Sequence, residues 1–238
     1  MNLEKIKIWA VTDGSQGMVS QVMGLSKQIS SNITEIKTDL IFPWNKIQPG
    51  FLPTYKWIFK NNFPIYNEPN ILISCGRKSV YFSLYCKKKF KKILNIHIQN
   101  PKVSLQNFDF VVVPDHDSID GPNVLISKGA IHYLTIDEIN NAKNYLENKI
   151  EKGKDVITLI LGGPTKYYNY SKENIIQIFS KINKQILEKN LQLILIPSNR
   201  TPENTIKFAK EYFNKDRLVV EGIDKKATSV GSNPIKLQ

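Results

Sequence analysis

Residues 6–29 read IKIWAVTDGSQGMVSQVMGLSKQI, and this stretch decides the fold class. The apolar run from Ile6 to Thr12 has the length of a buried strand, and residues 13–17 (DGSQG) form a turn. From Met18 to Ile29 the apolar residues recur at helical spacing. A strand, a glycine-containing turn and a helix in direct succession are typical of a parallel α/β sheet.

The same order of strand, loop and helix recurs along the rest of the chain. Further strands are predicted at residues 33–40, 71–74, 92–98, 108–113 and 124–126, and helices from Val80 onward and over 136–150. After a charged hinge at 151–155, strands are predicted at 156–161, 191–196 and 217–220, and helices at 171–188, with Ser171 as N-cap, and at 202–213. We therefore expect an α/β protein of two Rossmann-like domains, residues 1–152 and 153–238, each with a parallel sheet between helices.

The segment 41–69 interrupts this pattern. It contains five prolines and the large aromatic residues Trp44, Phe51, Trp57 and Phe59. Because these aromatic side chains need burial, we expect a packed excursion rather than a linker.

The composition is that of a globular chain. The 238 residues are 41% hydrophobic and 23% charged, with 12 glycines and 12 prolines, which excludes disordered and collagen-like classes. No apolar run reaches the ~18–20 residues of a membrane span, and the first one ends at Asp13, too early for a signal peptide. Cys75 and Cys86 fit neither a disulfide framework nor a zinc motif, so we expect a cytoplasmic protein.

The net charge of +12 is spread evenly and consists almost wholly of lysine, since Arg77, Arg200 and Arg217 are the only arginines. Arginine is the residue favoured for bidentate recognition of phosphates and bases, so no nucleic-acid partner is expected. The densest cluster, residues 87–92 (KKKFKK), is interpreted as a solvated helix end, with a patch for acidic lipid or nucleic acid as the alternative.

Ligands of open α/β sheets bind at the carboxyl ends of strands, so the informative residues are those that follow strands. Gly14, Ser15, Gln16 and Gly17 follow the first strand and open a helix, where backbone N–H groups attract an anion. This loop is neither a GxGxxG nor a Walker sequence. A tight structural turn and a ligand loop both stay open as interpretations.

Two of the three arginines occupy similar positions. Arg77 lies beside Gly76 at a strand–helix turn, which suits a phosphate or carboxylate, or else a surface ion pair at a helix start. Arg200 lies in the loop 197–202 after a later strand. A phosphate between that loop and residues 162–165 (GGPT) would be held by backbone N–H groups, Thr165 and Arg200.

All three histidines lie at predicted strand ends or in loops. They are His97, close to Gln99; His116, within the segment 114–117 (PDHD); and His132. A single histidine is more often structural, but three at predicted carboxyl edges indicate that at least one faces a cleft. No set of His, Asp or Glu has metal-ligand spacing, so no metal is expected.

Taken in order, these loops resemble one family. The ordered set consists of residues 12–14 with Gly17, 76–77, 97–99 with Pro101, 113–117, 121–124, 129–130 with His132, 161–164 and 198–202. The series resembles the mitochondrial fission protein family, called "elongated mitochondria" for its plant members and common in alphaproteobacteria. Bacterial members often carry a nucleoside-diphosphate-sugar epimerase label, which the missing GxxGxxG-type loop does not support.

The family is similar to glycosyltransferases with two facing Rossmann-like domains, the GT-B arrangement. The resemblance implies an acceptor on the first domain and a nucleotide-sugar mainly on the second, with residues 14–17 facing the cleft. It further implies that Gly162, Gly163 and Thr165 approach a donor phosphate, assisted by Arg200. The candidate base is Asp13 or His116, and no cofactor is expected beyond the nucleotide-sugar substrate. The remaining candidate binding residues are Arg77, His97, Gln99, Asn123, Ser198 and Thr201.

A non-catalytic adaptor at a membrane surface is the alternative function. It would use the 87–92 cluster and exposed aromatic residues of 41–69, at the inner face of the membrane. Plant members of the family are linked to recruiting a dynamin-related protein to mitochondria.

The chain departs from the family in two places. Asn199 stands where the family tends to have a second basic residue, and the family continues past residue 238, with 231–234 (GSNP) resembling the start of a later segment. The second domain would hold three strands where about five or six are usual. We therefore expect an incomplete second domain with an exposed apolar sheet edge after Val220.

Overall fold

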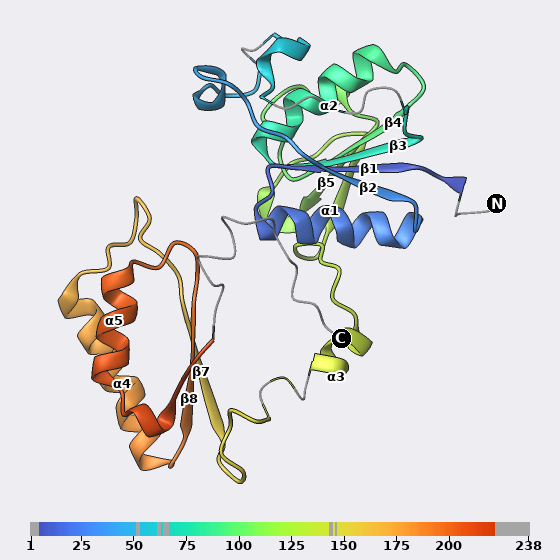
Figure 1. The fold of residues 1–238 in the computed structure, drawn as a ribbon. Helices are drawn as coiled ribbons and strands as arrows, with labels where there is room; N and C mark the ends of the chain where they lie inside the picture. The colour runs from blue at the N-terminus through green and yellow to red at the C-terminus, as the bar shows by residue number, and fades with distance from the viewer. Residues whose placement is uncertain are drawn as a thin grey trace. The chain divides into compact units, whose positions relative to one another are not determined.

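The structure is a computed structural model of the chain, and it describes residues 5–50, 53–60, 63, 67–142, 145 and 147–221. It divides into two compact units, Met1–Thr135 (unit 1) and Ile136–Gln238 (unit 2), drawn in Figure 1. Each unit contains a parallel sheet and helices, which confirms the expected α/β class.

The structural boundary lies earlier in the chain than the expected division between residues 152 and 153. Residues of the intervening stretch bond within unit 2: the Gln192 side chain binds the backbone of Lys149 and Glu151, and Lys149 pairs with Glu221. The division at 152/153 stays a prediction about independently folding domains.

The sheet of unit 1 has six strands in the order β2-β1-β3-β4-β5-β6, and each neighbouring pair is parallel. The strands are β1 (Ile8–Thr12), β2 (Ile33–Lys37), β3 (Ile71–Cys75), β4 (Leu94–Ile98), β5 (Phe110–Pro114) and β6 (Val124–Ser127). Because all of them run the same way, the loops that follow them meet at one edge of the sheet.

Two helices of unit 1, α1 (Gln16–Ile29) and α2 (Arg77–Lys89), cover opposite faces of this sheet (Figure 1). The alternation of side chains along a strand explains how β1 serves both faces. Ile8 and Ala10 belong to the core beneath α1, and Trp9 and Val11 to the core beneath α2.

The segment between β2 and β3 packs against the α2 side of the sheet, as expected for a packed excursion. Leu40, Ile58 and Phe59 are buried in the same core as Trp9. The expectation that all its aromatic residues are buried is wrong for Trp57, which is 55% exposed. Phe51 lies outside the described residues.

Unit 2 contains a three-stranded parallel sheet in the order β7-β8-β9. Its elements are α3 (Ile136–Ala142), β7 (Val156–Leu161), α4 (Lys172–Glu188), β8 (Gln192–Pro197), α5 (Glu203–Tyr212) and β9 (Leu218–Val220). The N-cap prediction is confirmed, because the Ser171 hydroxyl accepts the Asn174 N–H at 3.2 Å. The helix predicted over 136–150 is described as α3 over Ile136–Ala142, and residues 147–150 form turns and a bend instead.

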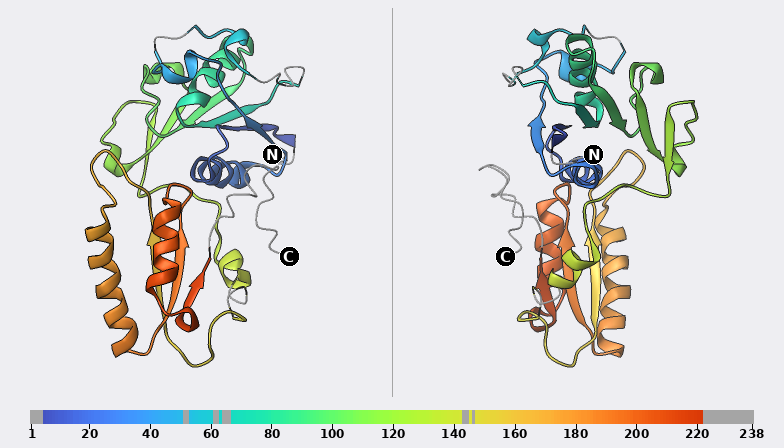
Figure 2. Two further views of the ribbon diagram at one scale, coloured as in Figure 1. Left: turned by 60° about the vertical axis from the view of Figure 1, so that its left-hand side comes forward. Right: turned by 90° about the vertical axis from the view of Figure 1, so that its right-hand side faces the viewer.

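Helices α4 and α5 pack together on one face of this sheet, with the rings of Phe179 and Phe208 stacked at 5.6 Å. Helix α3 lies on the other side of the sheet (Figures 1 and 2). On β7, Ile160 is 72% exposed and Val156 38%. The expected apolar edge at β9 consists of half-buried residues, and the chain from residue 222 onward lies outside the described residues.

Candidate functional site

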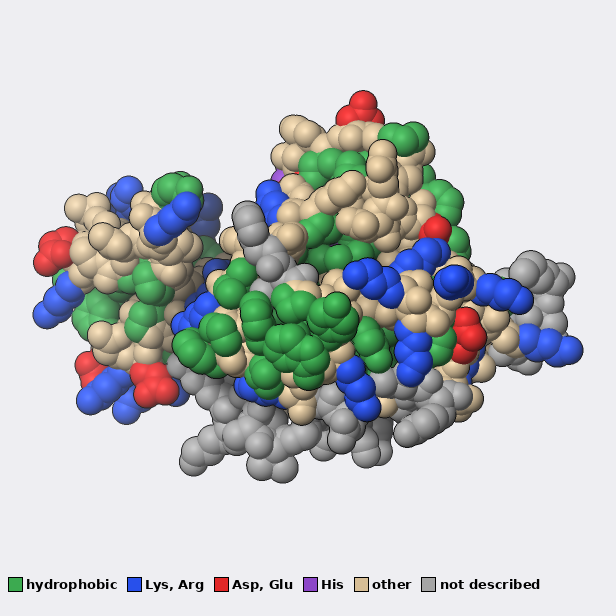
Figure 3. Space-filling model, turned by 90° about the horizontal axis from the view of Figure 1, so that it is seen from above, with side chains coloured by type: hydrophobic (Ala, Val, Ile, Leu, Met, Phe, Trp, Pro, Cys, Tyr) green, Lys and Arg blue, Asp and Glu red, His purple; other side chains and the backbone are tan. Residues whose placement is uncertain are grey.

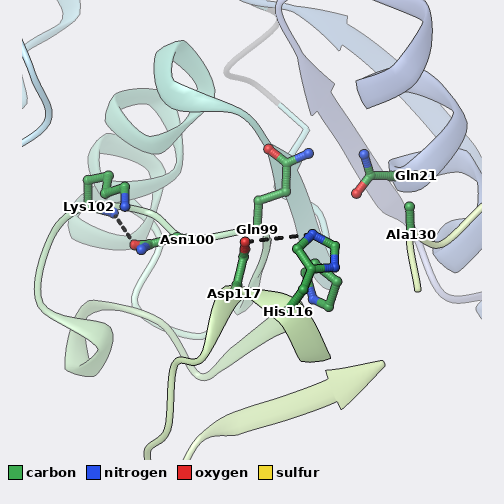
Figure 4. A pocket seen from close by; sticks show the side chains of 8 residues that line it. Gln21, Gln99, Asn100, Lys102, His116, Asp117 and Ala130 are labelled. Atoms are coloured by element: carbon green, nitrogen blue, oxygen red, sulfur yellow. Dashed lines mark hydrogen bonds and ion pairs between the residues drawn. The ribbon is translucent and has the colours of Figure 1, made fainter. Parts of the chain in front are cut away.

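A hollow of about 350 Å³ opens at the carboxyl edge of the unit 1 sheet, above β4 and β5. In Figure 4 the side chains of Gln21, Gln99 and His116 converge on it from three different elements. The full lining consists of Gln21, Gln99, Asn100, Lys102, Pro114, His116, Asp117 and Ala130. The structure therefore brings together two residues predicted from the sequence, Gln99 and His116.

The loops that form the hollow hold unusual backbone conformations. Gln99, Lys102 and Ser118 have φ angles of 79°, 58° and 50°, in the left-handed region that non-glycine residues seldom adopt. Hydrogen bonds hold the first of these loops in place: the Gln99 N–H donates to the Val112 carbonyl at 2.8 Å, and the Lys102 N–H to Asn100 Oδ1 at 2.9 Å. Strained residues of this kind cluster at functional sites.

The side of the hollow formed by Ala130 depends on Gly24 of α1. A Cβ atom at Gly24 would lie 2.6 Å from the backbone carbonyl of His132. The glycine thus lets the chain that follows β6 cross directly over α1. This crossing places Ala130 on the same hollow as Gln21.

The lining is chemically suited to a ligand rich in hydroxyl groups. Three carboxamides, from Gln21, Gln99 and Asn100, each offer both a donor and an acceptor. The lining also contains the imidazole of His116. Carboxylates flank it, with Asp115 Oδ1 3.7 Å from Nδ1 and Asp117 Oδ1 3.9 Å from Nε2.

Asp13, the other candidate base, does not reach this hollow. The sheet order puts β3 and β4 between β1 and β5, so the loops after β1 and β5 are about 14 Å apart at strand spacing. Asp13 Oδ1 accepts the Ser15 N–H at 2.9 Å, and Thr12 Oγ1 accepts the Gly14 N–H at 3.0 Å. Asp13 thus shapes its own turn, and Gln16 and Gly17 are the candidates left for an anion.

The crevice between β1 and β3, where this sheet order reverses, is filled by a side chain. A Cβ atom at Gly76 would lie 2.1 Å from Met18 Sδ, so Met18 packs directly on that glycine. Arg77 points elsewhere: its guanidinium donates to the Asn45 carbonyl at 2.7 Å. Arg77 therefore anchors the segment around Asn45, and its phosphate-binding role stays a prediction.

His97 corrects a second expectation, because it lies inside the core and not at the open edge. Its side chain is 1% exposed, its Nδ1 lies 2.8 Å from the Ser74 hydroxyl, and its ring packs on Phe108. Burial lowers the pKa of His97 from 6.5 to about 3, so the ring is neutral at ordinary pH. A buried neutral imidazole supports packing and cannot contact a ligand in the hollow.

Asn123 also differs from expectation, since it precedes β6 and therefore lies at the opposite edge of the sheet. Its side-chain amide donates to the carbonyls of Leu105 and Phe108, both at 2.8 Å. Asn123 ties the chain before β5 to β6.

In unit 2 the loops after β7 and β8 touch, as expected from the glycines. A Cβ atom at Gly163 would lie 2.3 Å from the Arg200 carbonyl oxygen. Thr201, 1% exposed, joins the loops through its hydroxyl, which lies 2.7 Å from the Leu161 carbonyl oxygen. The Ser198 N–H donates to that hydroxyl at 2.8 Å. Ser198 and Thr201 are therefore engaged inside the protein rather than facing a ligand.

Thr165 remains a candidate for ligand contact. It lines a second hollow, of about 570 Å³, together with Gly163, Tyr168 and the start of α4. Its hydroxyl accepts the N–H groups of Tyr167 and Tyr168 at 3.2 and 3.1 Å. This leaves the hydroxyl hydrogen to donate to an anionic oxygen. The guanidinium of Arg200 is exposed near the same loop.

Sequence reasoning missed Gln21, Asn100 and Lys102. The sequence marked this loop through Gln99 and the Asn100–Pro101 turn dipeptide, but the positive φ angles in it have no glycine to signal them. Cys75 and Cys86 are free and buried, and burial raises the pKa of each thiol to about 12. Within the described residues, no three His, Cys, Asp or Glu side chains are grouped to hold a metal, and no helix is long and apolar enough to cross a bilayer.

Three comparisons relate the chain to known proteins, and one of them, a family model, assigns a family. The family model described as mitochondrial fission ELM1 matches residues 16–235. An uncharacterized protein of Rickettsia prowazekii (strain Madrid E) is 24% identical over 241 residues, a match covering 83% of this chain and 66% of the relative. A solved UDP-N-acetylglucosamine 2-epimerase from Rickettsia bellii matches at 12% identity and a TM-score of 0.43, over 91% of this chain and 68% of its own. This structural likeness is too weak to define an arrangement of the two units.

Proposed function

Since the chain belongs to the mitochondrial fission ELM1 family, we propose that it is a glycosyltransferase-like protein that binds a nucleotide-sugar and transfers the sugar to an acceptor. The observation that carries the proposal is the amide-lined hollow of unit 1 with His116 at its wall. The chain spans 66% of the relative's length, so the proposal concerns the protein at the length of its family.

In this proposal the hollow of unit 1 holds the acceptor. Gln21, Gln99 and Asn100 hydrogen-bond to its hydroxyl groups, and their mixed donors and acceptors match those hydroxyls. His116 accepts the proton of the attacking hydroxyl as a new bond forms to the sugar. The flanking carboxylates of Asp115 and Asp117 stabilise the imidazolium that results.

The donor is assigned to the touching loops of unit 2. Thr165 donates its hydroxyl hydrogen to a phosphate oxygen, and Arg200 supplies the positive charge that a departing diphosphate requires. Gly163 supports this arrangement because it lets the two loops lie against each other. No metal enters this mechanism, and the cation at the phosphate is a protein side chain.

A thermal-shift titration with uridine nucleotides and UDP-sugars tests the proposal, on this chain and on a version extended to the length of the relative. We expect a nucleotide to raise the midpoint of unfolding. Arg200→Gln should weaken that binding roughly tenfold or more, through loss of a charge-assisted hydrogen bond. Lys207→Gln, on the exposed surface of α5, is the matched control and should bind as the parent does.

The base is tested separately in the extended protein. His116→Gln keeps an amide in the hollow but removes the proton acceptor, so nucleotide binding should persist while transfer falls about 100-fold or more. His132→Gln is the control for loss of an exposed imidazole. Absence of any nucleotide-induced shift in both lengths of chain would refute the proposal.

A further inference from the structure

Unit 1 exposes a group of aromatic side chains on the α2 side of its sheet. Phe42 is 76% exposed, Tyr55 62% and Trp57 55%. The rings of Trp44 and Trp57 meet edge to face at 5.6 Å, and Tyr55 stacks on Trp57 at 6.5 Å. We call Phe42, Trp44, Tyr55 and Trp57 the aromatic surface. Figure 3 views this side of the molecule and shows hydrophobic side chains gathered there, with Lys and Arg side chains beside them.

The fold keeps the rings of Phe42, Tyr55 and Trp57 exposed to solvent. Ile58, next to Trp57, is fully buried, and Phe59 forms a bridge to Leu40. Two side chains of α2 hold the residues that follow Trp44. Arg77 donates to the Asn45 carbonyl, and the Tyr81 hydroxyl donates to the Ile47 carbonyl at 3.2 Å. The aromatic surface therefore stays exposed because its immediate neighbours are anchored in the core.

The charge around the aromatic surface has one sign. Residues 40–67 contain Lys46, Lys56 and Lys60 and no acidic residue, and residues 77–108 contain none either. The two segments meet, since Lys88 at the end of α2 donates to the Thr54 hydroxyl beside Tyr55. Lys46, Lys56 and Lys88 are exposed, and all three lie on or beside the segment that carries the rings.

This charge includes one lysine of the predicted 87–92 cluster, Lys88, but not Lys87. Lys87 is engaged in contacts within the protein: its ammonium pairs with Asp109 at 2.6 Å and donates to the Ile93 carbonyl at 2.8 Å. Lys60 and Lys78 likewise bind Asp39, and these hydrogen bonds hold the pKa of Asp39 at about 2. The carboxylates of Asp39 and Asp109 are thus already paired with other lysines.

The residue types favour one class of partner. Protein–protein interfaces are enriched in arginine and depleted in lysine, and the arginine nearest this surface, Arg77, is committed to Asn45. Tryptophan and tyrosine beside lysines are the composition that settles at the boundary of lipid headgroups and acyl chains. Lysine ammonium groups there are drawn to anionic headgroups.

We infer that the aromatic surface, with Lys46, Lys56 and Lys88, docks unit 1 reversibly on an anionic lipid bilayer. Phe42 and Trp57 enter the interface between headgroups and acyl chains, and the three lysines contact acidic headgroups. The inference does not depend on nucleotide binding, and its residues lie outside both hollows.

Co-sedimentation of the full chain with vesicles tests it, comparing phosphatidylcholine mixed with phosphatidylglycerol against phosphatidylcholine alone. We expect binding to the anionic vesicles that weakens as salt is added. The Lys56→Gln and Lys88→Gln changes should each weaken it roughly fivefold. Lys181→Gln and Lys207→Gln, on helices of unit 2, are the charge-matched controls and should leave it within twofold.

The aromatic contribution has its own matched pair. Phe42→Ser combined with Trp57→Ser should lower binding by more than tenfold, whereas Tyr167→Ser, which removes a ring 77% exposed in unit 2, should not. Quenching of tryptophan fluorescence by brominated lipid should fall in Trp57→Phe and be lost when Trp44→Phe is added, since the third tryptophan, Trp9, is 1% exposed. Circular dichroism verifies that the variants fold.

Three results would overturn the inference: no binding to anionic vesicles, equal binding to neutral ones, or equal loss in the unit 2 controls. Capture of a protein by this surface without any vesicle binding would overturn it as well. Uridine nucleotide binding is measured on the same samples, so that a failure of membrane docking can be told apart from a failure of the proposed nucleotide-sugar function.

Discussion

At the scale of single residues, surroundings decide the role more than residue type does. His97 lies within β4 and is buried in the core, whereas His116 follows β5 and is exposed. The Ser74 hydroxyl bonds the buried ring of His97 at 2.8 Å. The chemistry available to a histidine at the end of a strand therefore depends on whether its ring is buried or exposed.

The buried histidine makes stability depend on pH. The folded chain leaves His97 neutral down to about pH 3, whereas the unfolded chain protonates it below its ordinary pKa of 6.5. Unfolding thus takes up a proton in this window, and the free energy of unfolding should fall by up to ~1.4 kcal/mol per unit as pH decreases. Urea unfolding over mildly acidic pH measures this slope.

A variant pair isolates the contribution of His97. His97→Gln should lower stability at neutral pH and flatten the slope, while His116→Gln, which changes an exposed imidazole, should keep the slope of the parent. If both variants show the parental slope, acid sensitivity comes from other groups. Should His97→Gln fail to fold, His97→Asn provides the same comparison.

At the scale of elements, helix α1 connects the fold to the hollow. Gly24 allows the chain after β6 to pass over the helix, and Gly17 near its start faces open space. Two glycines in one helix thus serve opposite purposes, because only Gly24 meets a backbone. The position of Ala130 against Gln21 is a consequence of that crossing.

Replacing each glycine by alanine distinguishes these purposes. Gly24→Ala should destabilise the protein by about 1–3 kcal/mol, because its Cβ would overlap the His132 carbonyl. Gly17→Ala should stabilise it by about 0.5–1 kcal/mol through helix propensity. Chemical denaturation measures both. A stabilising Gly24→Ala would mean that residues 131–132 do not lie against α1.

At the scale of the whole molecule, side-chain hydrogen bonds connect the stretch before the charged hinge to unit 2. Gln192, 5% exposed on β8, bonds to the Lys149 carbonyl at 3.0 Å and the Glu151 N–H at 2.8 Å. Tyr145 and Lys149 reach Glu221. The stretch that precedes β7 thus completes the hydrogen bonds of unit 2.

A pair of fragments tests this division. The fragment 136–238 should unfold at a higher denaturant concentration than 153–238, because the shorter one leaves the buried Gln192 amide unpaired, at a cost of about 1–3 kcal/mol. Introducing Gln192→Leu into both should shrink the difference, since no amide is then left without partners. Equal stability of the two unaltered fragments would favour a boundary at 152/153.

Local patterns in the sequence were enough to predict the fold class and the approximate position of every strand that bounds a candidate site. Short apolar runs ended by glycine or polar turns are a local signal, and β1, β3 and β7 lie close to where that signal puts them. The loops that follow the strands could therefore be named in advance, including the loops after β4 and β5 that carry Gln99 and His116. The N-cap at Ser171 could likewise be predicted from neighbouring residues in the sequence.

Which of those loops lie close together depends on the tertiary structure. Strand order separates Asp13 from His116, burial withdraws His97, and hydrogen bonds across the fold commit Arg77 and Thr201. The exposure of Trp57 beside the buried Ile58 is equally non-local. These outcomes depend on contacts between residues far apart in the chain, and periodicity, which reports on neighbours in sequence, carries no information about them.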